Sequence, residues 1–133
     1  MHKILDFPKI FDSRGNLTFL ESNQHVPFDI KRVFWIYDVP GGESRGAHAY
    51  KSQEEIIIAL GGSFDVLLTD KMGIEYKISM NRAYKGLFIP KLTWRSIENF
   101  STNSCALILS SSNFDSNDYI LNFSDFLNFK NEF

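Results

Sequence analysis

Short apolar runs separated by turn residues dominate most of the chain. Runs of this kind cover 16–22, 30–39, 55–60, 63–70, 74–80, 84–90, 93–100 and 104–112. Several alternate apolar with polar residues, and others are rich in β-branched and aromatic residues, as strands are. Gly61-Gly62 separates two runs in the manner of a hairpin turn. Many short strands with turn residues about every 8–12 positions predict an antiparallel β-sandwich or barrel.

The end of the chain has a different period. Apolar residues within 115–131 recur at helical spacing: Tyr119, Ile120, Phe123, Phe126 and Leu127. Asp115 or Ser116 precedes them as a candidate N-cap. We therefore expect a short C-terminal helical segment, one helix or two, packed on the sheet. Because no linker or repeat interrupts the pattern, residues 1–133 are expected to form a single domain.

Composition narrows the classes of function. The net charge is −2 and no basic stripe is present, which argues against a nucleic-acid binder. No apolar run approaches the roughly 18 residues of a membrane span, and the start of the chain lacks the pattern of a signal peptide. Cys105 is the only cysteine, so no internal disulfide can form. We expect a protein of the cytoplasm, with no membrane partner.

The central part of the chain contains an interrupted metal-binding pattern. Its spacing resembles the two cupin motifs, which place two His and a Glu on one hairpin and a third His on another. The anchoring residues of that spacing are Gly42, Gly62, Pro90 and Asn99. The four ligand positions hold His48, Tyr50, Glu55 and Arg95. The spacing therefore predicts an all-β fold of the cupin type.

This set of four residues is a poor metal site. A metal ion needs three or four lone-pair donors, and Arg95 offers none because it stays protonated. Tyr50 ligates only after losing a proton whose reference pKa is about 10. We therefore expect no metal and no other cofactor, and a barrel in which a polar site has replaced the metal.

A replaced metal site can still bind and react. Strand alternation puts His48 and Tyr50 on the same side, and we expect them to line one pocket in the barrel with Glu55 and Arg95. An imidazole transfers protons near neutral pH. A phenol donates a hydrogen bond to an enolate oxygen, and an arginine stabilises an oxyanion or holds a phosphate.

With these residues placed, the chain resembles the sugar-nucleotide 3,4-ketoisomerases, the dTDP-4-oxo-6-deoxyglucose 3,4-oxoisomerases, which are small WxcM-like cupins. The stretches that carry the resemblance are 7–21, 26–51, 60–70, 86–101 and 112–120. The most specific are "DSRG" and "IKRV" combined with "RGAHA". The resemblance implies an RmlC-like jelly-roll barrel and a homodimer that exchanges N-terminal strands.

The resemblance also implies a reaction. The substrate would be a dTDP-linked 4-keto-6-deoxy hexose whose ketone moves from C4 to C3 through an enediol, without a metal. Products of such enzymes supply amino sugars to surface glycans. Carried over to this chain, the catalytic residues would be Arg45, His48 and Tyr50.

The chain departs from the family pattern at several positions. The pattern "RGxHAH" has a second His where this chain has Tyr50, and the family often has His where this chain has Arg95. Phe34 and Trp35 stand where the family often has two Tyr. Two alternatives therefore stay open: a non-catalytic cupin that binds a sugar nucleotide, and a related sugar-nucleotide epimerase.

Further residues are candidates for substrate binding. Arg14 would hold the diphosphate, or else form a surface salt bridge with Asp12 or Glu21. Arg32 would line the pocket or sit at its rim. Trp35 and Trp94 would stack on the thymine base or the sugar, or else pack in the core. Glu55 and Arg95 complete the predicted set.

Overall fold

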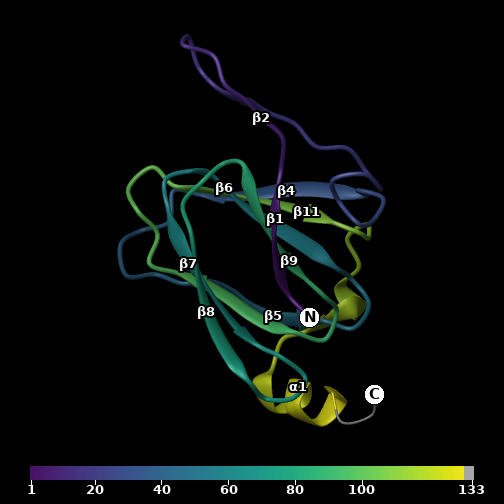
Figure 1. Cartoon of the computed structure of the whole chain (residues 1–133). Helices are drawn as coiled ribbons and strands as arrows, with labels where there is room; N and C mark the ends of the chain where they lie inside the picture. The colour runs from purple at the N-terminus through teal and green to yellow at the C-terminus, as the bar shows by residue number, and fades with distance from the viewer. Residues whose placement is uncertain (131–133) are drawn as a thin grey trace.

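The computed structural model describes residues 1–130, which form two five-stranded sheets and a small hairpin (Figure 1). The first sheet has the order β1 (Lys3–Asp6), β9 (Lys85–Ile89), β6 (Glu55–Gly61), β11 (Cys105–Ser110) and β4 (Arg32–Tyr37). The second has the order β12 (Tyr119–Ile120), β5 (Arg45–Tyr50), β10 (Trp94–Glu98), β7 (Phe64–Thr69) and β8 (Glu75–Met80). All pairings between these strands are antiparallel. The two sheets face each other, as a jelly roll requires.

The main core lies between the two sheets. Its fully buried members are Ile57, Ala59, Phe64, Val66, Leu68, Met80, Leu87, Ile89, Ile97, Ala106 and Ile108. A second cluster lies on the other side of β6, where Phe7, Val26 and Phe28 pack against Ile56 and Ile58. Both faces of β6 are therefore covered. This explains why "IIIA", which follows Glu55, is a continuous apolar run rather than an alternating one. Each buried isoleucine contributes about 1.5–3 kcal/mol.

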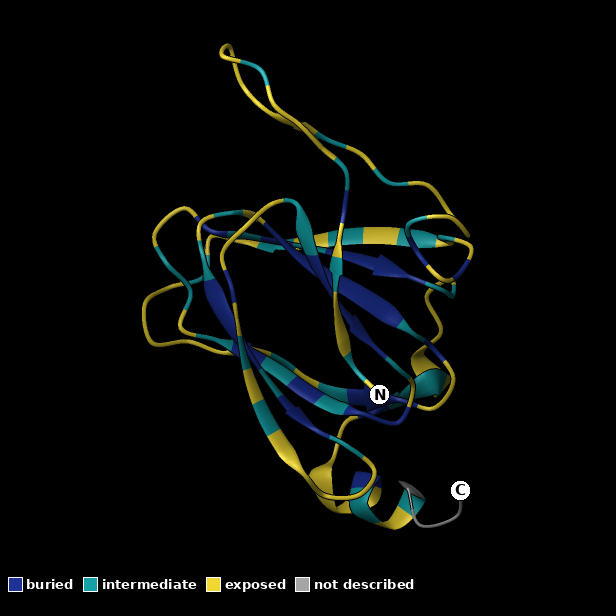
Figure 2. Cartoon of the chain, viewed as in Figure 1, coloured by how far each residue is buried: buried dark blue, intermediate teal, exposed yellow. Residues whose placement is uncertain are grey.

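The N-terminal region forms a hairpin that projects from the barrel. Its strands, β2 (Lys9–Ile10) and β3 (Leu17–Thr18), pair only with each other among the described residues. The hairpin is mostly exposed, in contrast to the strands of the barrel (Figure 2). The strand predicted over 16–22 is thus only two residues long, because no neighbouring strand of the same chain extends the pairing.

The predicted C-terminal helical segment is confirmed, but a two-residue strand divides it into a 3₁₀ turn and an α-helix. A 3₁₀ turn, η1 (Ser116–Asp118), is capped by the Asp115 carboxylate, which accepts a hydrogen bond from the backbone N–H of Asn117. The chain then forms β12 and ends in α1 (Phe123–Lys130). Phe126 of α1 is buried against Ala49 on the outer face of β5. Residue 131, the end of the predicted segment, lies outside the described residues. No helix within residues 1–130 is long and apolar enough to span a membrane.

Candidate active site

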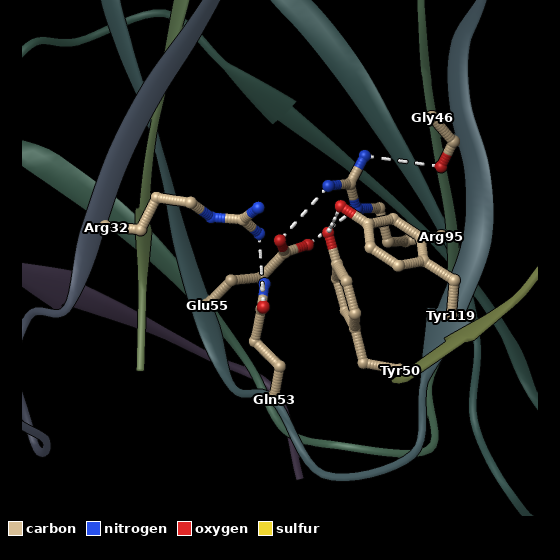
Figure 3. A network of polar contacts seen from close by, with 7 residues as sticks. All are labelled: Arg32, Gly46, Tyr50, Gln53, Glu55, Arg95 and Tyr119. Atoms are coloured by element: carbon tan, nitrogen blue, oxygen red, sulfur yellow. Dashed lines mark hydrogen bonds and ion pairs between the residues drawn. The ribbon is translucent and has the colours of Figure 1, made fainter. Parts of the chain in front are cut away.

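The inward-facing side of β5 meets β6, β10 and β12 at a group of polar side chains. We call this group the polar cluster; its members are Arg32, His48, Tyr50, Gln53, Glu55, Arg95 and Tyr119. Figure 3 shows six of them converging from separate elements. A groove of about 620 Å³ lies elsewhere, under the N-terminal hairpin, and contains no member of the cluster.

An ion pair between Glu55 and Arg95 is the most deeply buried part of the cluster. Arg95 Nε lies 2.5 Å from Glu55 Oε1, and Arg95 Nη2 lies 3.0 Å from Glu55 Oε2. Each side chain is only 1% exposed. Burial by itself would lower the pKa of Arg95, but the charge of Glu55 and its hydrogen bonds outweigh burial and raise that pKa. Arg95 is therefore a fixed positive charge inside the barrel.

A glycine on β5 makes room for this guanidinium. Gly46 has a φ of 69°, and a Cβ there would lie 2.1 Å from Arg95 Nη1. Its carbonyl accepts the third hydrogen bond of the guanidinium, from Nη1 at 3.2 Å. The register between β5 and β10 shifts at this point, as at a β-bulge. The glycine in "RGAHAY" thus has a steric cause, since only glycine fits both the backbone angle and the space.

Three rings surround the reactive part of the cluster. His48 lies opposite Arg95 in the β5–β10 pairing. Its ring centroid is 4.8 Å from that of Tyr50 and 5.0 Å from that of Tyr119. The two phenol oxygens are 3.4 Å apart. Tyr119 reaches the site because β12 pairs with β5, with Tyr119 opposite Tyr50.

The surroundings set the charge of these rings. Burial, followed by the positive charges of Arg95 and Arg32, lowers the pKa of His48 to about 3. Burial, followed by the negative charge of Glu55, raises the pKa of Tyr50 above its ordinary value. At neutral pH the imidazole is therefore uncharged and keeps a lone pair, while the phenol of Tyr50 keeps its proton. His48 Nε2 is buried and has no hydrogen-bond partner among the residues that the structure describes.

Arg32 and Gln53 form the remaining part of the cluster. Arg32 Nη2 donates to Gln53 Oε1 at 3.2 Å, and the guanidinium lies over the ring of Phe34 at 4.8 Å. Arg32 Nε and Gln53 Nε2 are buried and have no hydrogen-bond partner within the described part of the chain. Since an unpaired buried donor costs about 1–3 kcal/mol, these donors point to a ligand that carries acceptor oxygens.

The carboxylate of Asp118 holds the loop that carries Gln53. It accepts hydrogen bonds from the Ser52 backbone N–H at 2.9 Å, the Ser52 hydroxyl at 2.7 Å and the Gln53 backbone N–H at 3.0 Å. The segment that contributes Tyr119 therefore also fixes the loop between β5 and β6.

Comparisons with known proteins identify relatives of this chain. The model of the WxcM-like, C-terminal (FdtA) family matches residues 1–131. The TDP-4-oxo-6-deoxy-α-D-glucose-3,4-oxoisomerase of Aneurinibacillus thermoaerophilus is 38% identical over 94% of this chain and 89% of its own length. The chain belongs to the WxcM-like FdtA family.

Solved structures of similar proteins carry the same kind of name. The WlaRB TDP-quinovose 3,4-ketoisomerase of Campylobacter jejuni is 43% identical, covers 96% of this chain and 97% of its own, and has a TM-score of 0.90. A 3,4-ketoisomerase of Helicobacter canadensis is 39% identical over 98% and 97% of the two chains, with a TM-score of 0.93. The RmlC epimerase of Mycobacterium tuberculosis, 15% identical with a TM-score of 0.77, shares the fold and confirms the predicted jelly-roll barrel.

The structure brings together five of the nine residues that the sequence predicts for the site. They are Arg32, His48, Tyr50, Glu55 and Arg95. Glu55 and Arg95 form a buried ion pair with each other, however, and each side chain is only 1% exposed. Within residues 1–130, no group of three or more His, Cys, Asp or Glu side chains is placed so as to hold a metal ion.

The other four predicted residues lie apart from the cluster within one chain. Arg14 is 88% exposed on the hairpin and forms a 2.9 Å ion pair with Asp12, the surface alternative named above. Trp94 neighbours Arg95 on β10, so it faces the opposite side of the sheet and packs on α1. Trp35 is 57% exposed on β4, and Arg45 is exposed at the start of β5.

Two members of the cluster were missed by sequence reasoning. Tyr119 is placed by its spacing in a predicted helical segment and not in the site, because that spacing hides a two-residue strand that pairs with β5. The sequence gives no signal for Gln53, because one polar residue within the wholly polar run "KSQEE" looks like part of a solvated turn. Its burial, with only 2% exposed, depends on the fold of the loop.

Proposed function

We propose that this protein converts a dTDP-linked 4-keto-6-deoxy hexose into its 3-keto isomer, by proton transfer and without a metal. The observation that carries the proposal is His48 Nε2, an uncharged and unpaired imidazole nitrogen enclosed beside a protonated phenol. The choice of substrate is supported by the names of relatives. One relative, from Thermoanaerobacterium thermosaccharolyticum, is 32% identical and was solved with TDP-4-keto-6-deoxyglucose bound.

The reaction requires a base at C3 and stabilisation of an enediolate. His48 removes the C3 proton, the imidazolium exchanges that proton with solvent, and a proton is then delivered to C4. The imidazolium therefore exists only alongside the anionic intermediate. Tyr50 donates a hydrogen bond to the developing oxyanion, and the fixed charge of Arg95 stabilises negative charge nearby. A general base of this kind is worth about 10²–10⁴-fold in rate. The isomerisation needs no external oxidant, because the carbon reduced and the carbon oxidised belong to the same sugar.

The diphosphate needs positive groups, and exposed arginines are the candidates. Arginine binds phosphate through two parallel hydrogen bonds. Arg45 lies at the edge of β5, on the strand that carries His48. Arg14 lies on the projecting hairpin, so its predicted role depends on a second copy of the chain.

We propose that a second copy binds through exchange of the hairpin. The hairpin exposes four large apolar residues, Ile10, Phe11, Leu17 and Phe19, with exposed fractions of 41–79%. The groove of about 620 Å³ lies beside it, and the edge strand β4 exposes Val33, Trp35 and Tyr37. Unpaired edges and apolar patches of this kind favour strand pairing between chains. Light scattering should give the mass of a dimer for the wild type and of a monomer for Phe11→Asp.

A direct test uses TDP-4-keto-6-deoxyglucose in deuterated water with chelator-treated protein, followed by NMR. We expect a 3-keto product with deuterium at C4, and we expect His48→Asn to abolish it. If the wild type binds the nucleotide by saturation transfer but exchanges neither C3 nor C4, the protein is a binding module. If a product forms only after a metal ion is added, the metal-free reaction is wrong.

A further inference from the structure

Two phenols, rather than one, face the imidazole. Tyr50 on β5 and Tyr119 on β12 are register partners, so the strand pairing itself holds their rings side by side at 4.7 Å. Both rings also contact His48. Figure 3 shows the two hydroxyl groups pointing toward the same place, next to the Glu55–Arg95 pair.

The distance between the hydroxyls leaves them available to a ligand. At 3.4 Å, the contact between the oxygens is longer than the 2.5–3.0 Å usual for hydroxyl groups. Each hydroxyl has one proton to donate and two lone pairs to accept with, and the weak mutual contact uses little of that capacity. Two adjacent oxygens of a ligand, such as those of a vicinal hydroxy-ketone, match a pair of hydroxyls at this spacing.

The proposed reaction needs such a pair, because it moves two protons. One proton goes from C3 to C4, and the other goes from O3 to O4. A single imidazole that holds the carbon proton cannot carry the hydroxyl proton at the same time. A second carrier close to both oxygens would move the hydroxyl proton while the imidazole holds the carbon proton.

We propose that Tyr119 is a further catalytic residue and that the Tyr50–Tyr119 pair transfers the hydroxyl proton of the sugar from O3 to O4. This inference rests on the proposed function. One phenol donates its proton to O4 and receives a proton from its neighbour, which takes the proton of O3. His48 removes the C3 proton in the same phase and, after exchange with solvent, delivers a proton to C4. The O–H and C–H bonds broken equal those formed, and both phenols and the imidazole return to their starting states.

The test separates proton removal at carbon from completion of the isomerisation. Wild type, Tyr50→Phe, Tyr119→Phe and Tyr76→Phe are each incubated with TDP-4-keto-6-deoxyglucose in deuterated water. NMR then follows the loss of the C3 proton of the substrate and the formation of product. Tyr76 is the matched control, since its hydroxyl also makes a 3.4 Å contact, to Asp70, but lies outside the polar cluster.

We expect Tyr119→Phe to slow product formation by about 10²-fold or more. Exchange at C3 should fall much less, because His48 still forms an enediolate that returns to substrate. The ratio of exchange to product should therefore rise, and Tyr50→Phe should change it in the same direction. Tyr76→Phe should match the wild type.

Two other results would each be decisive. Suppose that the wild type reacts and that Tyr119→Phe lowers exchange and product formation equally, or lowers neither of them. Tyr119 is then only structural, and the proposed proton relay through the Tyr50–Tyr119 pair is wrong. If the wild type binds TDP but gives neither exchange nor product, the proposed reaction fails and the relay fails with it.

Discussion

The barrel contains two buried polar groups that differ in how fully they are paired. Glu55 and Arg95 satisfy each other through two hydrogen bonds, and the Gly46 carbonyl accepts a third from Arg95. In contrast, Arg32, Gln53 and His48 each keep one buried nitrogen that has no partner within residues 1–130. The first group is complete in a single folded chain, whereas the second is complete only when something else supplies acceptors or donors.

This difference separates a structural role from a binding role. A paired buried charge contributes to the local electrostatics: burial, followed by the positive charge of Arg95, lowers the pKa of the neighbouring His48 imidazole. An unpaired buried group destabilises the free protein by about 1–3 kcal/mol and recovers that cost when a ligand binds. Four predictions test this difference between the paired and the unpaired group, in order of decreasing expected effect.

Breaking the paired group should have the largest effect. Arg95→Met leaves the Glu55 carboxylate buried without a counter-charge, and we expect a loss of about 3–5 kcal/mol in the free energy of unfolding. Urea unfolding measures it. The double variant Glu55→Leu with Arg95→Met removes both charges and should recover most of the loss. If Arg95→Met alone is as stable as the wild type, the buried carboxylate of Glu55 does not need Arg95 as its counter-charge.

The second prediction concerns pH. The pKa of His48 is lowered to about 3 in the folded protein, against about 6.5 when unfolded. Between these values the unfolded state binds the proton and the folded state does not, so stability falls as the pH is lowered from about 6.5 toward 3. The slope from this group is at most about 1.4 kcal/mol per pH unit. The stability of His48→Asn should fall less steeply over that range, and identical slopes would contradict the burial of a neutral imidazole.

The third prediction tests the support of the unpaired group. Asp118→Asn weakens three hydrogen bonds that hold Ser52 and Gln53. We expect a loss of about 1–3 kcal/mol in stability and weaker binding of TDP-4-keto-6-deoxyglucose, measured by denaturation and calorimetry. Asp125→Asn is a control, because its carboxylate is exposed on α1. Unchanged affinity in Asp118→Asn would mean that the loop holds its position without the carboxylate.

The smallest expected effect on stability comes from the unpaired group itself. Gln53→Leu removes an unsatisfied amide but also a partner of Arg32, so these contributions oppose each other and stability should change by less than about 1 kcal/mol. Affinity for the sugar nucleotide should fall nonetheless, by calorimetry. If stability falls strongly and affinity is unchanged, the amide of Gln53 has a structural role rather than a binding role.

Sequence reasoning recovered the barrel because its signals are local. Strand periods, the Gly61-Gly62 turn and the spacing from Gly42 to Gly62 depend on neighbours along the chain. It also identified His48, Tyr50, Glu55 and Arg95 as neighbours in space, since they occupy fixed positions of two motifs. It could not foresee that Glu55 and Arg95 would saturate each other, because that depends on side-chain distances across β6 and β10.

The differences between the predicted set and the polar cluster have separate physical causes. Trp94 was expected near the ligand, but strand alternation turns it away from Arg95 and toward α1. Tyr119 was hidden because a two-residue strand has too few positions for a period to be visible. Arg14 and Trp35 lie on surfaces whose covering, under the proposed dimer, belongs to another molecule. No pattern within one chain reports on such a neighbour.

The place of Tyr119 in the chain has a consequence for synthesis on the ribosome. Strands β1 to β11 are translated before β12, and a domain folds as a unit. Until β12 is translated, the edge of β5 lacks the strand that pairs with it. His48 and Tyr50 are therefore made before the second phenol. Under the proposed relay, a nascent chain gains its activity only after β12 has been translated and has paired with β5.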